Sequence, residues 1–356
     1  MLDSAILVRR QETPFWLSAT TYAAGLIVGL VLATVTLVWV GVPFKAVINE
    51  LVVEAFFTMD GLKLTTTSAI PLILVGVSTA IAMQVRFINI GIEGQLWLGA
   101  MAATWVAVND IGPESTRLFL MLFLAFVAGA LWIALPLLLK LRWQVSEVIT
   151  TLLLGNVAFL LVEHQLFGVW RDPSTGFPIS QEFGPSEMLS LIGWGNVHSG
   201  LWIALGAGVV CWFLMDHTRL GFYARTVGLN PAAAKGTGMP VFATISAVVL
   251  GAGGLCGVAG AVIVAGTEHR LNQSIGLGYL FSGIVIAFLA RAQPLPSILF
   301  AFVLGGIYTA GNVLKVFYSV SEAVVILIQG TVLMSVLISQ FFSTYHVTRP
   351  VWRGRA

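Results

Sequence analysis

Three polar side chains lie within seven residues of one another in a strongly apolar part of the chain. The stretch FINIGIEGQ, residues 87–95, contains Asn89, Glu93 and Gln95, and long apolar runs precede and follow it. A carboxylate at the centre of a bilayer costs about 2.5–3.5 kcal/mol on insertion scales. Lipid would not tolerate this segment, so it must line a cavity or be buried in protein. Its amide and carboxyl groups suit a neutral ligand that presents hydroxyls or base edges.

We expect six residues to contact a substrate, namely Phe87, Asn89, Glu93, Gln95, Trp97 and Asn156. Asn156 lies in the middle of the apolar stretch TTLLLGNVAFLL, where it supplies a second polar group for the same cavity. The aromatic members can stack on a base or a sugar. A structural alternative stays open for each residue. Glu93 would then cap backbone groups freed by a helix interruption at Gly91 and Gly94, the amides would pair between helices, and the rings would pack in the core.

A second segment with distinctive chemistry is DHTRLGFYARTVGLNPAAAKGTGMP, residues 216–240. Its NPAAAKGTG part predicts an N-cap at Asn230, Pro231 at the first helical position, a short alanine-rich helix and a glycine stop. A helix this short is not stable alone in water, so it needs a partner surface.

The elements that position these residues are predicted to be membrane-spanning helices. The chain is 58% hydrophobic and 10% charged, with a mean hydropathy of +0.93, whereas soluble domains carry about 25% charged residues. Apolar runs of about 20 residues predict an all-α, polytopic membrane protein. The ten expected spans are 17–40, 67–85, 88–108, 117–139, 146–166, 199–215, 241–265, 275–290, 296–314 and 323–342.

The distribution of basic residues predicts the orientation of these spans. With the N-terminus in the cytoplasm, 12 of the 18 Lys and Arg residues fall inside. This excess favours ten spans with both the N- and C-termini cytoplasmic. The polar stretch then opens the third span on its inner side, directly after Arg86, where its glycines can break the helix.

The chain is expected to form one membrane domain over residues 1–356. Its membrane core is 17–343, an outer (periplasmic) loop covers 168–199, and the inner (cytoplasmic) segment covers 216–240. The outer loop is either a lid at the membrane surface or a docking surface for a periplasmic partner.

Several functional classes are disfavoured by the composition. The net charge is +2 and no long basic run exists, which argues against nucleic-acid binding. The spans contain no paired carboxylates, metal-ligand His cluster or nucleophile constellation, so no catalytic or metal site is expected. Cys211 and Cys256 lie in apolar segments and are expected to be packing residues. Gly253 and Gly257 form a G-x-x-x-G pair, which predicts close packing of helices.

Three stretches resemble one protein family. FINIGIEGQLWLGA, SEVITTLLLGN and ARTVGLNPAAAKGTGMP are similar, in order and spacing, to the permease subunits of bacterial ABC importers. The closest group comprises nucleoside and simple-sugar permeases that work with basic-membrane-protein-type binding lipoproteins, and the wider family includes ribose and branched-chain amino acid permeases. The chain departs from the family at Gly155-Asn156, where an Asn-Tyr pair is common, and near Phe281, where an aspartate is frequent.

The resemblance implies an assembly in the bacterial inner membrane. A second permease subunit that differs from this chain, an ATPase subunit with two fused ATPase domains, and a periplasmic or lipoprotein binding protein are the implied partners, with membrane lipid around them. The implied ATPase-coupling residues are Arg225, Gly228, Asn230, Pro231, Ala232, Ala233, Gly236 and Gly238. The chain contains no G-x-x-x-x-G-K-[ST] phosphate loop, so ATP and Mg are expected on the ATPase subunit, and this chain binds no cofactor and is not itself an enzyme.

The predicted function is therefore translocation of nucleosides by alternating access, as a permease subunit of an ATP-driven importer. Ribose-like sugars and branched-chain amino acids remain as alternative substrates. An alternative from another class also remains, namely an ion-coupled secondary transporter in which Glu93 is a proton or sodium site in a broken helix.

Overall fold

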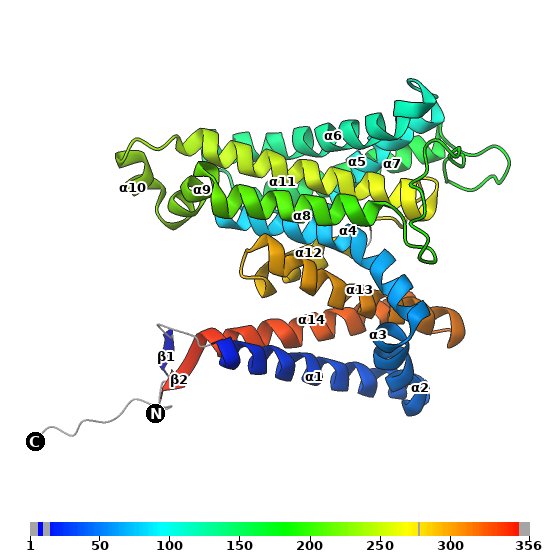
Figure 1. Cartoon of the computed structure of the whole chain (residues 1–356), viewed down its shortest axis with the longest axis horizontal. Coiled ribbons are helices and arrows are strands. Elements are labelled where there is room, and N and C mark those ends of the chain that lie inside the picture. Colours follow the sequence, from blue (N-terminus) through cyan, green and yellow to red (C-terminus); the bar gives the residue numbers. More distant parts are fainter. Residues whose placement is uncertain (1–5, 10–14, 277, 349–356) are drawn as a thin grey trace, which may run out of the picture. The chain divides into compact units, whose positions relative to one another are not determined.

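The computed structural model describes residues 6–9, 15–276 and 278–348, and nearly all of them are helical (Figure 1). A helix coincides with each predicted span. These helices are α1 (Phe15–Val40), α4 (Met59–Gln84), α5 (Ile92–Val108), α6 (Glu114–Trp143), α7 (Glu147–Phe167), α8 (Gly200–His217), α11 (Val241–Ile263), α12 (Tyr279–Leu289), α13 (Pro294–Phe317) and α14 (Glu322–Thr344). The all-α membrane fold is confirmed.

Shorter elements join these helices. They are α2 (Phe44–Ile48), α3 (Ala55–Phe57), α9 (Arg219–Leu229), α10 (Pro231–Gly236), the π-helical turns η1 (Asn49–Glu54) and η2 (Val264–Glu268), and the strands β1 (Ile6–Arg9) and β2 (Tyr345–Thr348). Eight helices within the described residues are long and apolar enough to cross a membrane. The other two predicted spans are shorter, because α5 has 17 residues and α12 has 11. At about 1.5 Å per residue, α12 covers only about half of the hydrocarbon layer, so the full span predicted at 275–290 is wrong in length.

The chain divides into two compact units, one made of the residues up to Glu50 and from Gly311 onward, the other of Leu51–Ala310. In the first unit, α1 packs along α14. A methyl group added at Gly29 would lie 2.8 Å from the Cα atom of Val332, so the missing side chain permits this close approach. The strands β1 and β2 pair antiparallel, from Ile6 opposite Thr348 to Arg9 opposite Tyr345, a pairing that the apolar pattern does not reveal.

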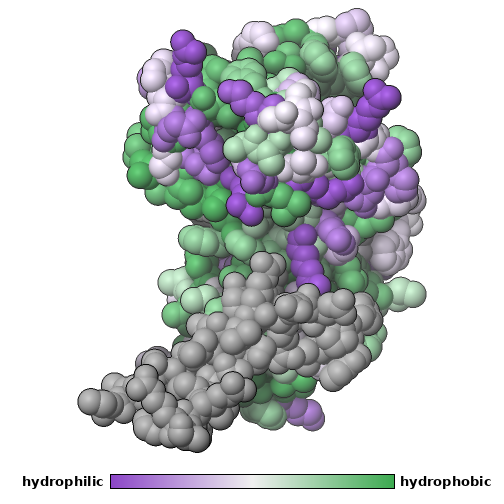
Figure 2. All heavy atoms as spheres, turned by 90° about the vertical axis from the view of Figure 1, so that its left-hand side faces the viewer, coloured by the Kyte–Doolittle hydropathy of each residue, from purple (hydrophilic) through white to green (hydrophobic). Residues whose placement is uncertain are grey.

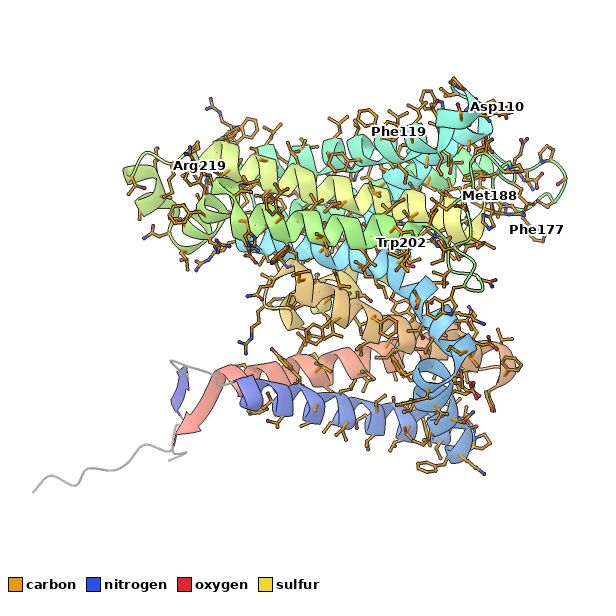
Figure 3. All side chains as sticks on the ribbon, viewed as in Figure 1. Asp110, Phe119, Phe177, Met188, Trp202 and Arg219 are labelled. Atoms are coloured by element: carbon orange, nitrogen blue, oxygen red, sulfur yellow. The ribbon has the colours of Figure 1, made fainter. Side chains whose placement is uncertain are left out.

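In the second unit, α4 and α11 are largely buried, while α6, α7 and α8 expose apolar side chains such as Phe119 and Trp202 (Figure 3). Small residues allow α11 to approach α6. A methyl group at Gly257 would lie 2.0 Å from the carbonyl oxygen of Ala125, and one at Gly253 would lie 2.8 Å from that of Gly129. The predicted close packing at the G-x-x-x-G pair is therefore confirmed.

One end of this second unit gathers the loops that were predicted to be cytoplasmic. The Gln84 side chain donates to the carbonyl of Ala292 at 2.9 Å, and Lys140 Nζ donates to the carbonyl of Arg86 at 3.1 Å. The helices α9 and α10 lie at the same end, because the backbone at Gly228 abuts the carbonyl of Gln84. Figure 2 looks onto this end, where hydrophilic residues are spread over the surface.

The opposite end gathers the loops that were predicted to be outside. Asp110, Phe177 and Met188 lie there, far from Arg219 at the other end (Figure 3). Within the second unit, the structure thus groups the connecting segments as the basic-residue pattern predicted. Which end of this unit faces the cytoplasm stays a prediction, as does the cytoplasmic location of both termini.

Candidate functional site

The polar stretch enters the second unit as non-helical backbone. Residues 87–90 precede α5, whose N-cap is Gly91. The expected start of the helix at residue 88 was therefore early by about one turn. Asn89 and Gln95 are both buried and bond to each other through their side-chain amides, and Asn89 Oδ1 also accepts a hydrogen bond from the N–H of Gly91 at 3.0 Å. These two amides stabilise the turn into α5.

The two glycines of the stretch permit close packing rather than interrupting a helix. A methyl group at Gly91 would lie 2.5 Å from the carbonyl oxygen of Thr151, and one at Gly94 would lie 2.7 Å from the Cα atom of Gly155. Gly94 lies within the first turn of α5, so the expectation that it breaks the helix was wrong.

A cavity of about 230 Å³ lies between α5 and α7. It is lined by Ile90, Glu93, Trp97, Leu152, Gly155, Asn156 and Phe159. Three of the six residues expected to contact substrate thus share one cavity, although they come from two helices about 60 residues apart in sequence. Phe87, Asn89 and Gln95 are not among its lining residues, and all three are buried.

Aromatic rings form one wall of this cavity. Trp97 and Phe159 meet edge-to-face, with ring centroids 5.5 Å apart and an interplanar angle of 60°. Phe159 was not singled out from the sequence, although it lies one turn after Asn156 on the same helix face, and this spacing could have revealed it. The Asn156 side chain is exposed, and its Nδ2 donates to the carbonyl of Leu152 at 3.0 Å.

Glu93 has a structural contact in addition to its place in the cavity wall. Its Oε1 atom accepts a hydrogen bond from the backbone N–H of Gly278 at 3.2 Å. Gly278 is the N-cap of α12. The carboxyl group therefore both lines the cavity and caps a second helix, so the two interpretations of Glu93 are compatible in geometry.

Lys140 ties the polar stretch to the two neighbouring helices. Its Nζ lies 5.0 Å from the ring centroid of Phe87, donates to the carbonyl of Arg86, and pairs with the Glu147 carboxylate at the start of α7. These contacts of Lys140 hold the backbone at residues 86–87, just before the residues that line the cavity.

The segment 216–240 folds largely as predicted. Asn230 Oδ1 accepts hydrogen bonds from the N–H groups of Ala232 and Ala233 at 3.1 and 3.0 Å, Pro231 opens α10, and the helix ends at Gly236. Gly238 follows with a φ of +78°, in the left-handed region that glycine favours. The predicted N-cap, first-turn proline and glycine stop are confirmed.

Two contacts attach this segment to the helices behind it. Arg225 on α9 donates to the carbonyl of Met215 at 2.6 Å and pairs with Asp216 at 3.0 Å. A side chain at Gly228 would collide with the end of α4. Ala234 is the buried residue of α10, whereas Pro231, Ala232, Ala233 and Gly236 are exposed. The segment is thus fixed to α4 and α8 and presents an apolar helix outward.

The loop 168–199 is anchored to the opposite end of the unit. The N–H groups of Ser180, Phe183 and Leu189 donate to carbonyls of the 265–271 segment at 2.8–2.9 Å. Glu187 is buried and paired with Arg117 of α6. Burial alone raises the pKa of the Glu187 carboxyl, but hydrogen bonds from Arg117 and Ser186 bring that pKa below its ordinary value.

His198 is a second buried anchor of this loop. Its Nδ1 atom accepts a hydrogen bond from the N–H of Gly200 at 3.2 Å, which places the proton on Nε2, 3.5 Å from Thr267 Oγ1. The pKa of His198 is lowered to about 4, mainly by burial of the ring and secondly by the nearby His269. The ring is therefore neutral at pH 7.

Comparisons with known proteins identify the family. Residues 61–337 match the family described as the permease component of the branched-chain amino acid transport system. The glucose ABC transporter permease protein TsgB13 of Haloferax volcanii is 34% identical over 95% of this chain and 92% of its own length. The guanosine ABC transporter permease protein NupP of Bacillus subtilis is 32% identical over 80% of this chain and 81% of its own length. The nucleoside ABC transporter permease protein NupB of Lactococcus lactis is 30% identical over 74% of this chain and 75% of its own length. The chain therefore belongs to the family of transport-system permease components that carries the branched-chain amino acid description.

Proposed function

We propose that this chain is the membrane subunit of an ATP-driven importer that moves nucleosides across the bacterial inner membrane by alternating access. The observation that carries the proposal is the cavity between α5 and α7, where Glu93 and Asn156 stand beside the aromatic pair Trp97 and Phe159. A flat base can stack on an aromatic wall, while carboxyl and amide groups bond its edge or the ribose hydroxyls.

Within this proposal, the six expected substrate residues take two different roles. Glu93, Trp97 and Asn156 contact the substrate. Asn89 and Gln95 satisfy each other, so they hold the cavity wall in shape without touching the substrate. Phe87 belongs with them, because it is buried beneath Lys140.

A sugar is the second candidate substrate. The similarity to a glucose permease of Haloferax volcanii favours it, and an aromatic wall with a carboxyl group also suits a sugar ring. The similarities to a guanosine and a nucleoside permease favour nucleosides. Family membership weighs against the ion-coupled transporter, because the relatives are named ABC transporter permeases.

The segment made of α9 and α10 is proposed to receive the ATPase subunit. Its exposed face includes Leu229, which is 75% exposed, and the first turn of α10. A short helix fixed to α4 and α8 can pass a displacement of the ATPase domains to the walls of the cavity. ATP and Mg bind on that ATPase subunit, which carries two fused ATPase domains.

A second permease chain is proposed to cover the exposed face of α7. Asn156 is exposed on this helix although the helix is apolar and long enough to cross the membrane. A facing subunit closes the cavity that Asn156 lines and so keeps this amide out of the lipid, where it is costly. The loop 168–199 is proposed to receive a periplasmic or lipoprotein binding protein at the outer end.

Two measurements test the proposed function. The cognate binding protein is screened by thermal shift against nucleosides, bases, sugars and branched-chain amino acids, and uptake is then measured in proteoliposomes that contain the complete complex. Nucleosides are expected to bind and to be taken up in a vanadate-sensitive manner that a protonophore does not abolish. Binding of sugars alone would replace the nucleoside assignment by the sugar one, and uptake abolished by a protonophore but not by vanadate would refute ATP-driven import.

A further inference from the structure

Gly278 is held at both of its backbone polar groups. Its N–H donates to Glu93 Oε1 at 3.2 Å. Its carbonyl oxygen accepts from Tyr308 Oη at 2.9 Å and from Ser282 Oγ at 3.0 Å. The two hydroxyls are themselves 3.0 Å apart, and the ring of Tyr308 stacks on that of Tyr279, with centroids 6.1 Å apart.

The backbone just before α12 also supports the second cavity residue. A methyl group at Gly276 would lie 2.4 Å from the indole nitrogen of Trp97, so this backbone packs directly against the indole ring. Glu93 and Trp97 thus both line the cavity. Glu93 also bonds the backbone of Gly278, and Trp97 packs against the backbone of Gly276.

The start of α12 has such partners. The helix is 11 residues long, too short to cross the hydrocarbon layer by itself. A carboxylate is a favourable partner for the N–H groups of a helix N-terminus, and Glu93 accepts the hydrogen bond of the Gly278 N–H. Gly278 has a φ of +89°, a conformation that side-chain-bearing residues rarely adopt, so this bond geometry depends on glycine.

We propose that Tyr308 is a positioning residue for substrate binding. It fixes Gly278, Gly278 fixes the carboxylate of Glu93, and the affinity of the cavity for its substrate depends on this chain of contacts. This inference rests on the proposed function, since it assumes that Glu93 contacts the substrate.

The test is direct binding of tritiated guanosine to the purified complex of both permeases and the ATPase in nanodiscs, without the binding protein. The variants are Tyr308→Phe, Glu93→Ala and the double variant. Phenylalanine keeps the ring that stacks on Tyr279 and removes only the hydroxyl. Thr309→Val is the matched control, because it removes a neighbouring buried hydroxyl that bonds Ser68 at 3.1 Å instead.

We expect Tyr308→Phe to weaken binding about three- to tenfold, the worth of one hydrogen bond, and Thr309→Val to leave it unchanged. In the Glu93→Ala background, Tyr308→Phe should have no further effect, because its influence passes through the carboxylate. Equal effects of Tyr308→Phe in both backgrounds, or none in either, would overturn the inference.

A second variant keeps the inference testable if Tyr308→Phe does not fold. If Tyr308→Phe fails to assemble, Ser282→Ala removes the other donor to the Gly278 carbonyl and is expected to weaken binding in the same direction. Unchanged binding in a well-folded Ser282→Ala complex would then count against the inference. If the wild-type complex binds no nucleoside but binds glucose, the proposed substrate fails, and the same cycle is run with glucose.

Discussion

Asn89 and Gln95 exchange two side-chain hydrogen bonds across the first turn of α5. Nδ2 of Asn89 donates to Oε1 of Gln95 at 2.9 Å, and Nε2 of Gln95 donates to Oδ1 of Asn89 at 3.2 Å. Both residues are almost fully buried. The polar stretch that contradicts the apolar character of the chain therefore satisfies much of its own hydrogen-bonding capacity.

The first prediction follows from this pair. Asn89→Ala and Gln95→Ala should each lower the free energy of unfolding by about 1–3 kcal/mol, because each leaves a buried partner unsatisfied. The double variant should cost less than the sum of the two. Thermal melting of the purified protein measures this, with Asn109→Ala as an exposed control that should change little. Strictly additive losses would show that the two amides act independently.

The second prediction concerns the crossing of α5 and α7. Gly94→Ala places a methyl group 2.7 Å from the Cα atom of Gly155, so it should force the helices apart, cost about 1–3 kcal/mol and reduce uptake. Gly206→Ala is the matched control, because nothing lies within 4 Å of its added methyl group. That control should be neutral or slightly stabilising. Equal melting temperatures for the two variants would contradict the close packing.

The third prediction concerns the exposed first turn of α10. Ala233→Trp should abolish uptake and substrate-stimulated ATP hydrolysis while the permease still folds, because the bulky ring blocks the surface proposed to receive the ATPase. Asn230→Ala should reduce coupling less, through loss of a cap worth about 1 kcal/mol. Ser115→Trp, at an exposed position on the opposite end, is the bulky control. Normal coupled uptake by Ala233→Trp would remove α10 from the ATPase interface.

The fourth prediction compares two ion pairs of the outer loop. Glu187→Gln removes the buried counter-charge of Arg117, which then keeps only the exposed carboxylate of Asp110 at 2.7 Å, and we expect a clear loss of stability. Glu182→Gln disrupts the pair with Arg270 at 3.0 Å, in which Glu182 is 62% exposed, so it should cost less than about 1 kcal/mol. Limited proteolysis of the loop and thermal melting distinguish the two. Similar behaviour of both variants would show that Glu187 does not anchor the loop.

The fifth prediction is a pH dependence that originates at His198. Its folded pKa of about 4 lies below the ordinary value of 6.5, so the unfolded chain binds the proton more readily. Its neutral form therefore favours folding above pH 6.5, and stability falls as the pH drops from 6.5 towards 4. The loss should be about 2 kcal/mol at pH 5. His198→Gln, which keeps an acceptor for the Gly200 N–H, should show a smaller difference in melting temperature between pH 7.5 and pH 5. An unchanged difference would place the origin elsewhere.

The sequence by itself determined the features that depend on local pattern. Apolar run length located the membrane helices, because the bilayer sets a minimum length. The cap at Asn230 and the stop at Gly238 were predictable because capping involves only residues within one turn. The position of Gly253 and Gly257 indicated a close helix contact, although not its partner, α6.

Only the tertiary structure decided what each polar residue does. Asn89, Gln95 and Glu93 are of similar chemical kind and lie within one short stretch, yet two of them pair with each other and the third bonds Gly278, 185 residues away. No role of Phe159, Lys140 or Tyr308 in the site was predictable from the sequence, because each is ordinary in its own helix. Their importance arises from helix crossings, which bring groups far apart in the sequence into contact in the buried interior, where partners in the protein stabilise polar groups.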